Sequence, residues 1–291
     1  MNISKEKQAI KYLQSFEPQD EPYYVGYSGG KDSDAIRILC SLAGVKHDLV
    51  NNHTTVDAPE TVRYIRSIPG VQINYPKLSM WQLIEKKKMP PTRLMRYCCE
   101  ELKEQGGKGR IKVMGVRWEE SAKRAESAGL VRIIGKPKTV QKVAEESGAN
   151  FRSTNSGGVV LNTDNAESRK VVETCYRTTS LMVNPIVDWT TSDVWQFLHH
   201  YGCESNPLYQ CGFRRIGCVG CPLGGTASMR REFARYPKYK QLYIKAFDRM
   251  LLAREAAGLT NHAMWTDGKG VMQWWLQEDA NQYTFFDEED I

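Results

Sequence analysis

The sequence has no apolar run of the roughly 18 residues that a membrane-spanning helix needs. Its first residues, MNISKEKQAIKYLQSFEPQDEP, are charged and contain no apolar segment of the kind that a signal peptide carries. Hydrophobic residues at 41% and charged residues at 25% are ordinary for a globular protein. We therefore expect a cytoplasmic protein with no membrane partner.

The eight cysteines do not predict a disulfide framework, because thiols stay reduced in the cytosol and serve there more often as metal ligands or catalysts. No cysteine follows Cys221, so residues 222–291 contain no thiol that can act as a nucleophile. The net charge of +6 suits a polyanionic ligand such as a nucleotide or nucleic acid, but many proteins with this balance bind neither.

Strand and helix patterns alternate along most of the chain. Predicted strands cover 23–27, 49–52, 71–75, 111–114 and 181–183, and predicted helices cover 34–42, 81–87, 94–104, 119–126, 192–200 and 228–257 with a further one from Pro59. This alternation predicts an α/β fold with a parallel twisted sheet and helices on both faces.

We expect two domains. Residues 1–205 form the α/β domain and carry a flexible insertion near 135–170, where the pattern dissolves around the polar run 153–158. Residues 206–291 form a cysteine loop and a helical segment, and residues 285–290 are expected to be a solvated acidic tail.

The segment Ser28–Ser33 (SGGKDS) lies between the first predicted strand and helix. Its spacing fits neither G-x-x-x-x-G-K-[ST] nor G-x-G-x-x-G. Even so, its glycines permit close approach of phosphate, the helix start offers free N–H groups, and Lys31 adds a positive charge. We therefore predict a phosphate-binding loop; the alternative is a plain glycine turn with a solvated lysine.

Two other polar positions follow predicted strands. Gly115 and Arg117 come just after a strand end, where ligands bind in open α/β sheets, and a guanidinium suits phosphate. The alternative for Arg117 is a structural ion pair with Glu119 or Glu120. Asp57 is a candidate contact for ribose or metal, or a cap for the helix that begins at Pro59.

Four cysteines form the remaining pattern, Cys98-Cys99 and Cys218-x-x-Cys221 in a glycine-containing loop. Four thiolates suit zinc or a [4Fe–4S] cluster. Adjacent cysteines fit zinc poorly, because the paired ligands of zinc are normally two to four residues apart. Cys40, Cys175, Cys203 and Cys211 read as core or incidental thiols.

The loop SGGKDS resembles the pyrophosphate (PP) loop of the adenine nucleotide α-hydrolase superfamily, which has a Rossmann-like fold. The wider chain resembles its phosphoadenosine phosphosulfate (PAPS) reductase branch, and in its motifs most closely the iron–sulfur DNA phosphorothioation ATP pyrophosphatases. The segments that carry this resemblance are 54–61, 115–124 (G-x-R-x-x-E-S-x-x-R), 184–190 and 206–209 (N-P-L-Y).

The resemblance implies an adenine nucleotide site and a cluster site. The implied nucleotide-binding residues are Tyr27, Ser28, Gly29, Gly30, Lys31, Asp32, Ser33, Thr55, Asp57, Gly115 and Arg117, with Lys31, Asp32 and Arg117 as the catalytic ones. The implied ligands of a [4Fe–4S] cluster, with zinc as the alternative, are Cys98, Cys99, Cys218 and Cys221.

Two departures from the reductases favour ATP as substrate. The chain lacks their C-terminal E-C-G-x-H cysteine, and its loop keeps Lys31 and Asp32, which theirs lacks. The expected reaction is cleavage of Mg²⁺-bound ATP between the α- and β-phosphates, which adenylylates an acceptor for sulfur transfer. A sulfonucleotide (APS or PAPS) reductase and a non-enzymatic nucleotide-binding subunit are the alternatives.

The expected partners are a nucleic acid acceptor and a cysteine desulfurase or other sulfur donor. Basic residues near the second cysteine pair could meet a nucleic acid backbone or form a solvated face; they are Arg214, Arg215, Arg230, Arg231, Arg235 and Lys238.

Overall fold

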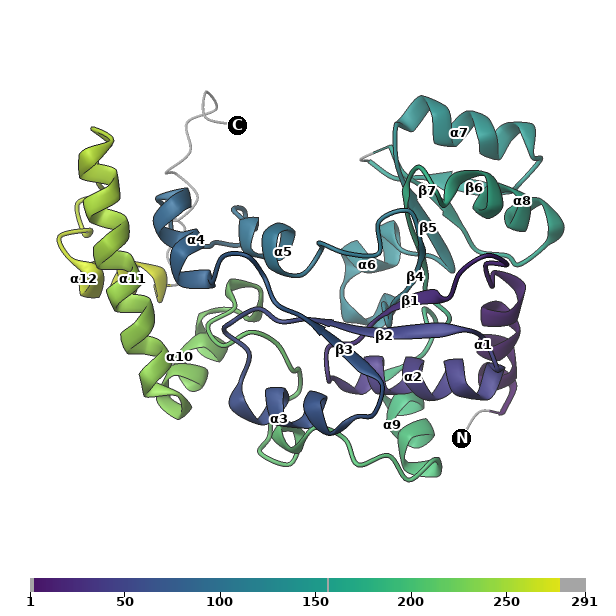
Figure 1. Cartoon of the computed structure of the whole chain (residues 1–291), viewed down its shortest axis with the longest axis horizontal. Helices are drawn as coiled ribbons and strands as arrows, with labels where there is room; N and C mark the ends of the chain where they lie inside the picture. The colour runs from purple at the N-terminus through teal and green to yellow at the C-terminus, as the bar shows by residue number, and fades with distance from the viewer. Residues whose placement is uncertain (1–2, 156, 278–291) are drawn as a thin grey trace. The chain divides into compact units, whose positions relative to one another are not determined.

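The structure is a computed structural model that describes residues 3–155 and 157–277 (Figure 1). The predicted acidic tail at 285–290 lies outside these residues. All eight cysteines lie within them, and none forms a disulfide. None of the helices in the described ranges combines the length and the apolar character that crossing a bilayer demands.

The chain divides into two compact units. The first contains residues 1–52, 59–74 and 105–216, and the second contains residues 53–58, 75–104 and 217–291. The chain passes from the first unit to the second for the last time after residue 216, whereas the sequence predicts a boundary after residue 205. The second unit also takes two earlier segments that carry no compositional signal of a domain boundary.

The first unit is built on a mixed eight-stranded sheet with the order β3-β2-β1-β4-β8-β5-β7-β6. Its strands are β1 (Tyr23–Gly26), β2 (His47–Asn52), β3 (Val71–Asn74), β4 (Ile111–Val113), β5 (Val131–Ile134), β6 (Phe151–Ser153), β7 (Val159–Leu161) and β8 (Ser180–Val183). The five strands predicted from the sequence pair in parallel, as expected. β1 and β7 are buried at successive residues, as in sheets covered on both faces.

Among the described residues, seven α-helices belong to this unit (Figure 1). They are α1 (Ile3–Ser15), α2 (Lys31–Ala43), α3 (Pro59–Ser67), α6 (Ala122–Ser127), α7 (Pro137–Glu146), α8 (Ala166–Cys175) and α9 (Thr191–His200). α1 and α9 both pack against α2, whose apolar side chains Ile36 and Leu39 are buried in the core. This packing fixes the first turn of α2 at the carboxyl end of β1.

The prediction of an irregular segment at 135–170 is wrong. The segment contains α7, β6, β7 and the start of α8, and β5, β7 and β6 extend the sheet by antiparallel pairing. Val140 and Ala144 of α7 and Val171 and Val172 of α8 are buried in the core. The segment is ordered by this packing, although its own strands, β6 and β7, are only three residues long.

The second unit contains α4 (Met80–Lys87), α5 (Tyr97–Leu102), α10 (Thr226–Arg235), α11 (Pro237–Ala256) and α12 (Gly268–Trp275). The single helix predicted for 228–257 is two helices, because Pro237 begins α11 and cannot continue α10. Figure 1 shows α11 beside α4. Aromatic side chains of α4, α10, α11 and α12 form one cluster, which consists of Trp81, Phe233, Tyr243, Phe247 and Trp275.

Candidate functional site

The loop between β1 and α2 has the geometry that the sequence predicts for an anion site. Gly29 has a φ of +69°, which favours glycine. A Cβ on Gly29 would also lie 2.8 Å from the Cγ1 of Ile65. The chain therefore needs glycine at this position both for its backbone conformation and for its packing.

The N–H groups at the start of α2 have no partner within the helix. Gly30 N–H donates to the Ser33 hydroxyl at 3.1 Å, and that hydroxyl donates to Gly30 O at 2.8 Å. Lys31 N–H donates to the hydroxyl of Tyr209 at 2.8 Å. In the part of the chain that the structure describes, the Asp32 and Ser33 N–H groups remain for a ligand, at the positive end of the helix dipole.

Asp32 joins the two cations of the loop. Its Oδ2 lies 2.8 Å from Lys31 Nζ, and its Oδ1 lies 2.8 Å from Arg117 Nε. Lys31 and Arg117 are buried, and Asp32 is partly exposed. The three predicted catalytic residues therefore lie together, with one carboxylate between two positive charges.

Arg117 also forms an ion pair with Glu119, which was the alternative to phosphate binding for this residue. Its Nη1 lies 2.8 Å from Glu119 Oε2 and donates to Trp189 O, and its Nη2 donates to the Thr191 hydroxyl. Hydrogen bonds from Thr191 and Arg117 lower the pKa of Glu119. Protein groups therefore bind all three guanidinium nitrogens and use four of the five N–H donors, which leaves one hydrogen of Nη2 for a phosphate.

Gly115, a predicted nucleotide contact, has a packing role. A Cβ there would lie 2.9 Å from Asp32 Cβ and 3.0 Å from Asp32 O. The end of β4 therefore comes close to the first turn of α2, and only glycine permits this approach.

Tyr27 immediately precedes the Ser28–Ser33 loop and anchors its first end through two hydrogen bonds. Its N–H donates to Val50 O at 2.8 Å, and its hydroxyl donates to Asp34 at 2.6 Å. Tyr64 donates to the other oxygen of Asp34 at 2.9 Å. Burial raises the pKa of Asp34, and the two tyrosine hydroxyls oppose that rise.

The N-P-L-Y segment also contacts the loop, a role that the sequence analysis does not predict for its residues. Asn206 is fully buried, and its Nδ2 donates to Gly29 O and to the Thr61 hydroxyl, each at 3.1 Å. Its Oδ1 accepts from Leu208 N–H, which begins a short 3₁₀ turn over Pro207–Tyr209. Tyr209 then reaches Lys31 N–H. The only sequence signal for this role is that the segment is part of the family resemblance.

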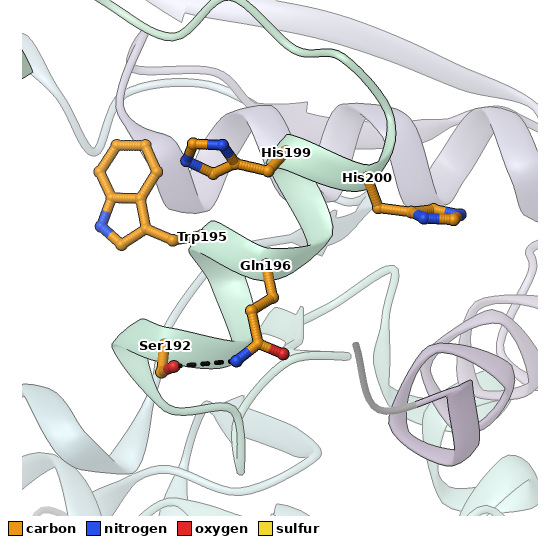
Figure 2. Close-up of a pocket in the computed structure, with 5 residues that line it drawn as sticks. All are labelled: Ser192, Trp195, Gln196, His199 and His200. Carbon is orange, nitrogen blue, oxygen red and sulfur yellow. Dashed lines mark hydrogen bonds between the residues drawn. The ribbon is translucent and has the colours of Figure 1, made fainter.

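A shallow hollow lies on α9 in the same unit. Figure 2 shows that its lining comes from this one helix, with Trp195 and His199 projecting to one side and His200 to the other. The Trp195 ring also meets Tyr209 edge-on, at 4.9 Å between centroids.

The four predicted cluster ligands all lie in the second unit. Cys98 and Cys99 lie in the first turn of α5, and their side chains share a hydrogen bond. This bond lowers the pKa of Cys99 and, with burial, raises that of Cys98. Cys218 and Cys221 act on Cys98 electrostatically, so the four thiols share one region of the unit.

The loop 217–221 is fixed against the aromatic cluster. Gly220 has a φ of +76°, and a Cβ there would lie 2.5 Å from Phe233. Val219 N–H donates to Val56 O, and Tyr243 donates to Val219 O. The two cysteines of the loop are therefore held by backbone contacts.

Thr55 and Asp57 belong to the second unit with the cysteines. Asp57 forms a β-bridge with Cys218, and its carboxylate accepts from Thr54 N–H at 2.8 Å. Thr55 has a φ of +65°, and its hydroxyl accepts from Met80 N–H. The fold thus groups both residues with the cysteine loop, a neighbourhood that the sequence did not predict.

No group of three or more His, Cys, Asp or Glu side chains within 3–155 and 157–277 is placed to hold a single metal ion. The donor set of four thiols nevertheless matches a [4Fe–4S] cluster. In such a cluster each thiolate binds a different iron, so the thiols lie farther apart than around one ion.

The sheet and its glycine-rich loop define a Rossmann-like α/β protein of the PP-loop type. A profile of the phosphoadenosine phosphosulfate reductase domain matches residues 22–223, and the chain belongs to that family.

Two uncharacterized proteins of Methanocaldococcus jannaschii are 24% and 25% identical over 244 and 239 residues, which are 82% and 79% of this chain. The chain spans less than half of each relative's length, 49% and 43%. Adenosine 5'-phosphosulfate reductase of Bacillus thuringiensis is 34% identical over 82 residues, 27% of this chain and 34% of that protein.

Among solved structures, PAPS reductase of Candida auris is similar at 15% identity and a TM-score of 0.44, over 75% of this chain and 89% of that one. The U34-tRNA thiolase NcsA of Methanococcus maripaludis, solved with its [4Fe–4S] cluster, is similar at 10% identity and a TM-score of 0.36, over 90% and 82% of the two chains.

Proposed function

We propose that the chain is an ATP pyrophosphatase that adenylylates an acceptor, releases pyrophosphate and prepares the acceptor for sulfur transfer. A nucleic acid is the proposed acceptor, and a cysteine desulfurase or another persulfide carrier is the proposed sulfur donor. The eight free cysteines suit a reducing compartment, so we place this reaction in the cytoplasm.

The observation that carries the proposal is the loop. It offers the N–H groups of Asp32 and Ser33 at the start of a 13-residue helix, beside the buried ammonium of Lys31. This combination suits the several negative charges of a β,γ-pyrophosphate. A substrate without that pyrophosphate would give Lys31, which also pairs with Asp32, fewer negative charges to bind.

In the proposed step, an acceptor oxygen attacks the α-phosphorus, and the bond from that phosphorus to the oxygen bridging to the β-phosphate breaks. AMP becomes attached to the acceptor, and pyrophosphate leaves with the electron pair. Lys31 and the loop N–H groups stabilise the charge on the leaving group. Mg²⁺ enters with the nucleotide, because this ion is usually held by substrate phosphates and few carboxylates.

The proposed cluster ligands are Cys98, Cys99, Cys218 and Cys221. A [4Fe–4S] cluster held there would have one thiolate on every iron, so it would supply redox and electrostatic chemistry beside the transferred sulfur and no open iron. The aromatic cluster and the backbone bonds of the loop 217–221 keep two of these thiols in place. Zinc is the alternative metal, and adjacent ligands in one helical turn count against it.

Sulfonucleotide reduction is the second candidate, and the family membership supports it. The two candidates differ in what the loop binds. We expect calorimetric titration to give tighter binding of ATP–Mg²⁺ than of adenylyl sulfate or PAPS. A preference for either sulfonucleotide would contradict the proposed function and favour the reductase.

A further inference from the structure

We infer that the Tyr209 hydroxyl is a further ligand of the phosphate group in the loop, donating its own hydrogen to the β,γ-pyrophosphate end of the nucleotide. The inference rests on the proposed function and adds to it a residue contributed from far along the chain. It concerns the first unit alone, where Tyr209 and the loop both lie.

The hydrogen-bond roles of this hydroxyl leave its hydrogen available. A tyrosine hydroxyl donates one hydrogen bond and also accepts. Here it accepts from Lys31 N–H at 2.8 Å, so its hydrogen points elsewhere. Among the residues that the structure describes, no acceptor for that hydrogen is found. Burial raises the pKa of Tyr209, so the hydroxyl stays protonated and able to donate at neutral pH.

The Tyr209 hydroxyl also lies next to the start of α2, where the phosphate group is expected. A Cβ built on Gly30 would be 3.4 Å from it, so the hydroxyl lies directly over the glycine at the helix start. Lys31 N–H is one of the groups that would otherwise face an anion. Tyr209 takes that bond and offers its own hydrogen instead, which extends the donor set outward from the helix.

Two hydrogen bonds fix Tyr209 and its segment against the loop. Asn206 Nδ2 donates to Gly29 O, just before Gly30, and the Tyr209 hydroxyl accepts from Lys31 N–H, just after it. The tyrosine ring meets Trp195 at an interplanar angle of 89°. A preformed donor loses little entropy when it binds, which is the requirement for an effective phosphate ligand.

The opposing reading is that Tyr209 blocks the site by occupying Lys31 N–H. The variant Tyr209→Phe keeps the ring and removes only the hydroxyl, and the two readings predict opposite changes in its affinity for pyrophosphate. If Tyr209 is a phosphate ligand, the affinity falls. If Tyr209 blocks the site, the affinity rises.

The test is calorimetric titration of the full chain with inorganic pyrophosphate and, separately, with adenosine. We expect Tyr209→Phe to weaken pyrophosphate binding at least about tenfold, the size of a lost hydrogen bond to a charged group, and to leave adenosine binding unchanged. Tyr201→Phe removes a hydroxyl that bonds Glu6 instead, and should change neither affinity.

Unchanged or tighter pyrophosphate binding by Tyr209→Phe would overturn this inference alone. Failure of the unmodified protein to bind pyrophosphate or ATP would overturn the proposed function and this inference with it.

Discussion

The guanidinium Nε of Arg117 lies 2.8 Å from Oδ1 of Asp32, so a buried arginine just beyond β4 holds the first turn of α2. The other oxygen of the same carboxylate binds Lys31. Asp32 thus occupies the position between two cations that a phosphate would otherwise favour. This relationship makes Arg117 a residue that positions the loop.

Arg117→Lys should lower the free energy of unfolding by about 2 kcal/mol, because an ammonium cannot replace the planar guanidinium that binds Asp32, Glu119 and Trp189 O. Urea denaturation measures this change. If stability is unchanged while ATP affinity falls, Arg117 contacts phosphate directly and its positioning role is wrong.

Lys31→Ala should weaken ATP–Mg²⁺ binding by about 2 kcal/mol, the scale of a lost charge-assisted contact. Lys11→Ala is the matched control, since Lys11 is exposed and pairs with Asp164. Calorimetry on both variants measures the difference. Equal affinity of the Lys31 variant and the unmodified protein would refute the role given to Lys31.

Gly115→Ala should destabilise the protein by about 1–3 kcal/mol, because its Cβ would press on the backbone and Cβ of Asp32. Gly217→Ala is the control, since a Cβ there meets no atom within 4 Å. Thermal melts of the two variants compare them. A Gly115 variant as stable as the Gly217 variant would show that this close approach is absent.

Much of the first unit could be predicted because its parallel strands and helices carry strong local patterns. β1 is a run of apolar residues, and α2 buries Ile36, Leu39 and Cys40 on one face. The insertion could not be predicted, because β6 and β7 have three residues each and become strands only by pairing. The break at Pro237 is readable from the sequence, because a proline inside a helical pattern ends the helix before it.

The site was predictable where its residues adjoin in sequence and unpredictable where they do not. Ser28–Ser33 forms a loop through its own glycines, so its pattern is local. Tyr209 lies 178 residues from Lys31, and their contact depends on the whole sheet and on α9. The bridge between Asp57 and Cys218 could not be predicted either, because the two residues are far apart in the sequence and no local spacing specifies their pairing.

Anaerobically purified protein should be brown and contain about four irons per chain, on the rule of four thiolates for a [4Fe–4S] cluster. Cys218→Ala should lose iron, whereas Cys203→Ser, in the first unit, should keep it. Iron analysis and visible absorption measure both. A colourless protein with one zinc per chain would contradict the cluster.

The central claim is that the chain cleaves ATP between its α- and β-phosphates, and product analysis tests it most directly. The anaerobic protein is incubated with its sulfur donor and a nucleic acid acceptor in two parallel reactions. One contains ATP labelled at the α- and γ-phosphates, and the other contains labelled PAPS and a dithiol reductant, which supplies the two electrons that sulfite formation needs. The account predicts release of labelled pyrophosphate, transfer of the α-label to the acceptor or its release as AMP, and no sulfite from PAPS. Sulfite from PAPS with ATP left intact would contradict it.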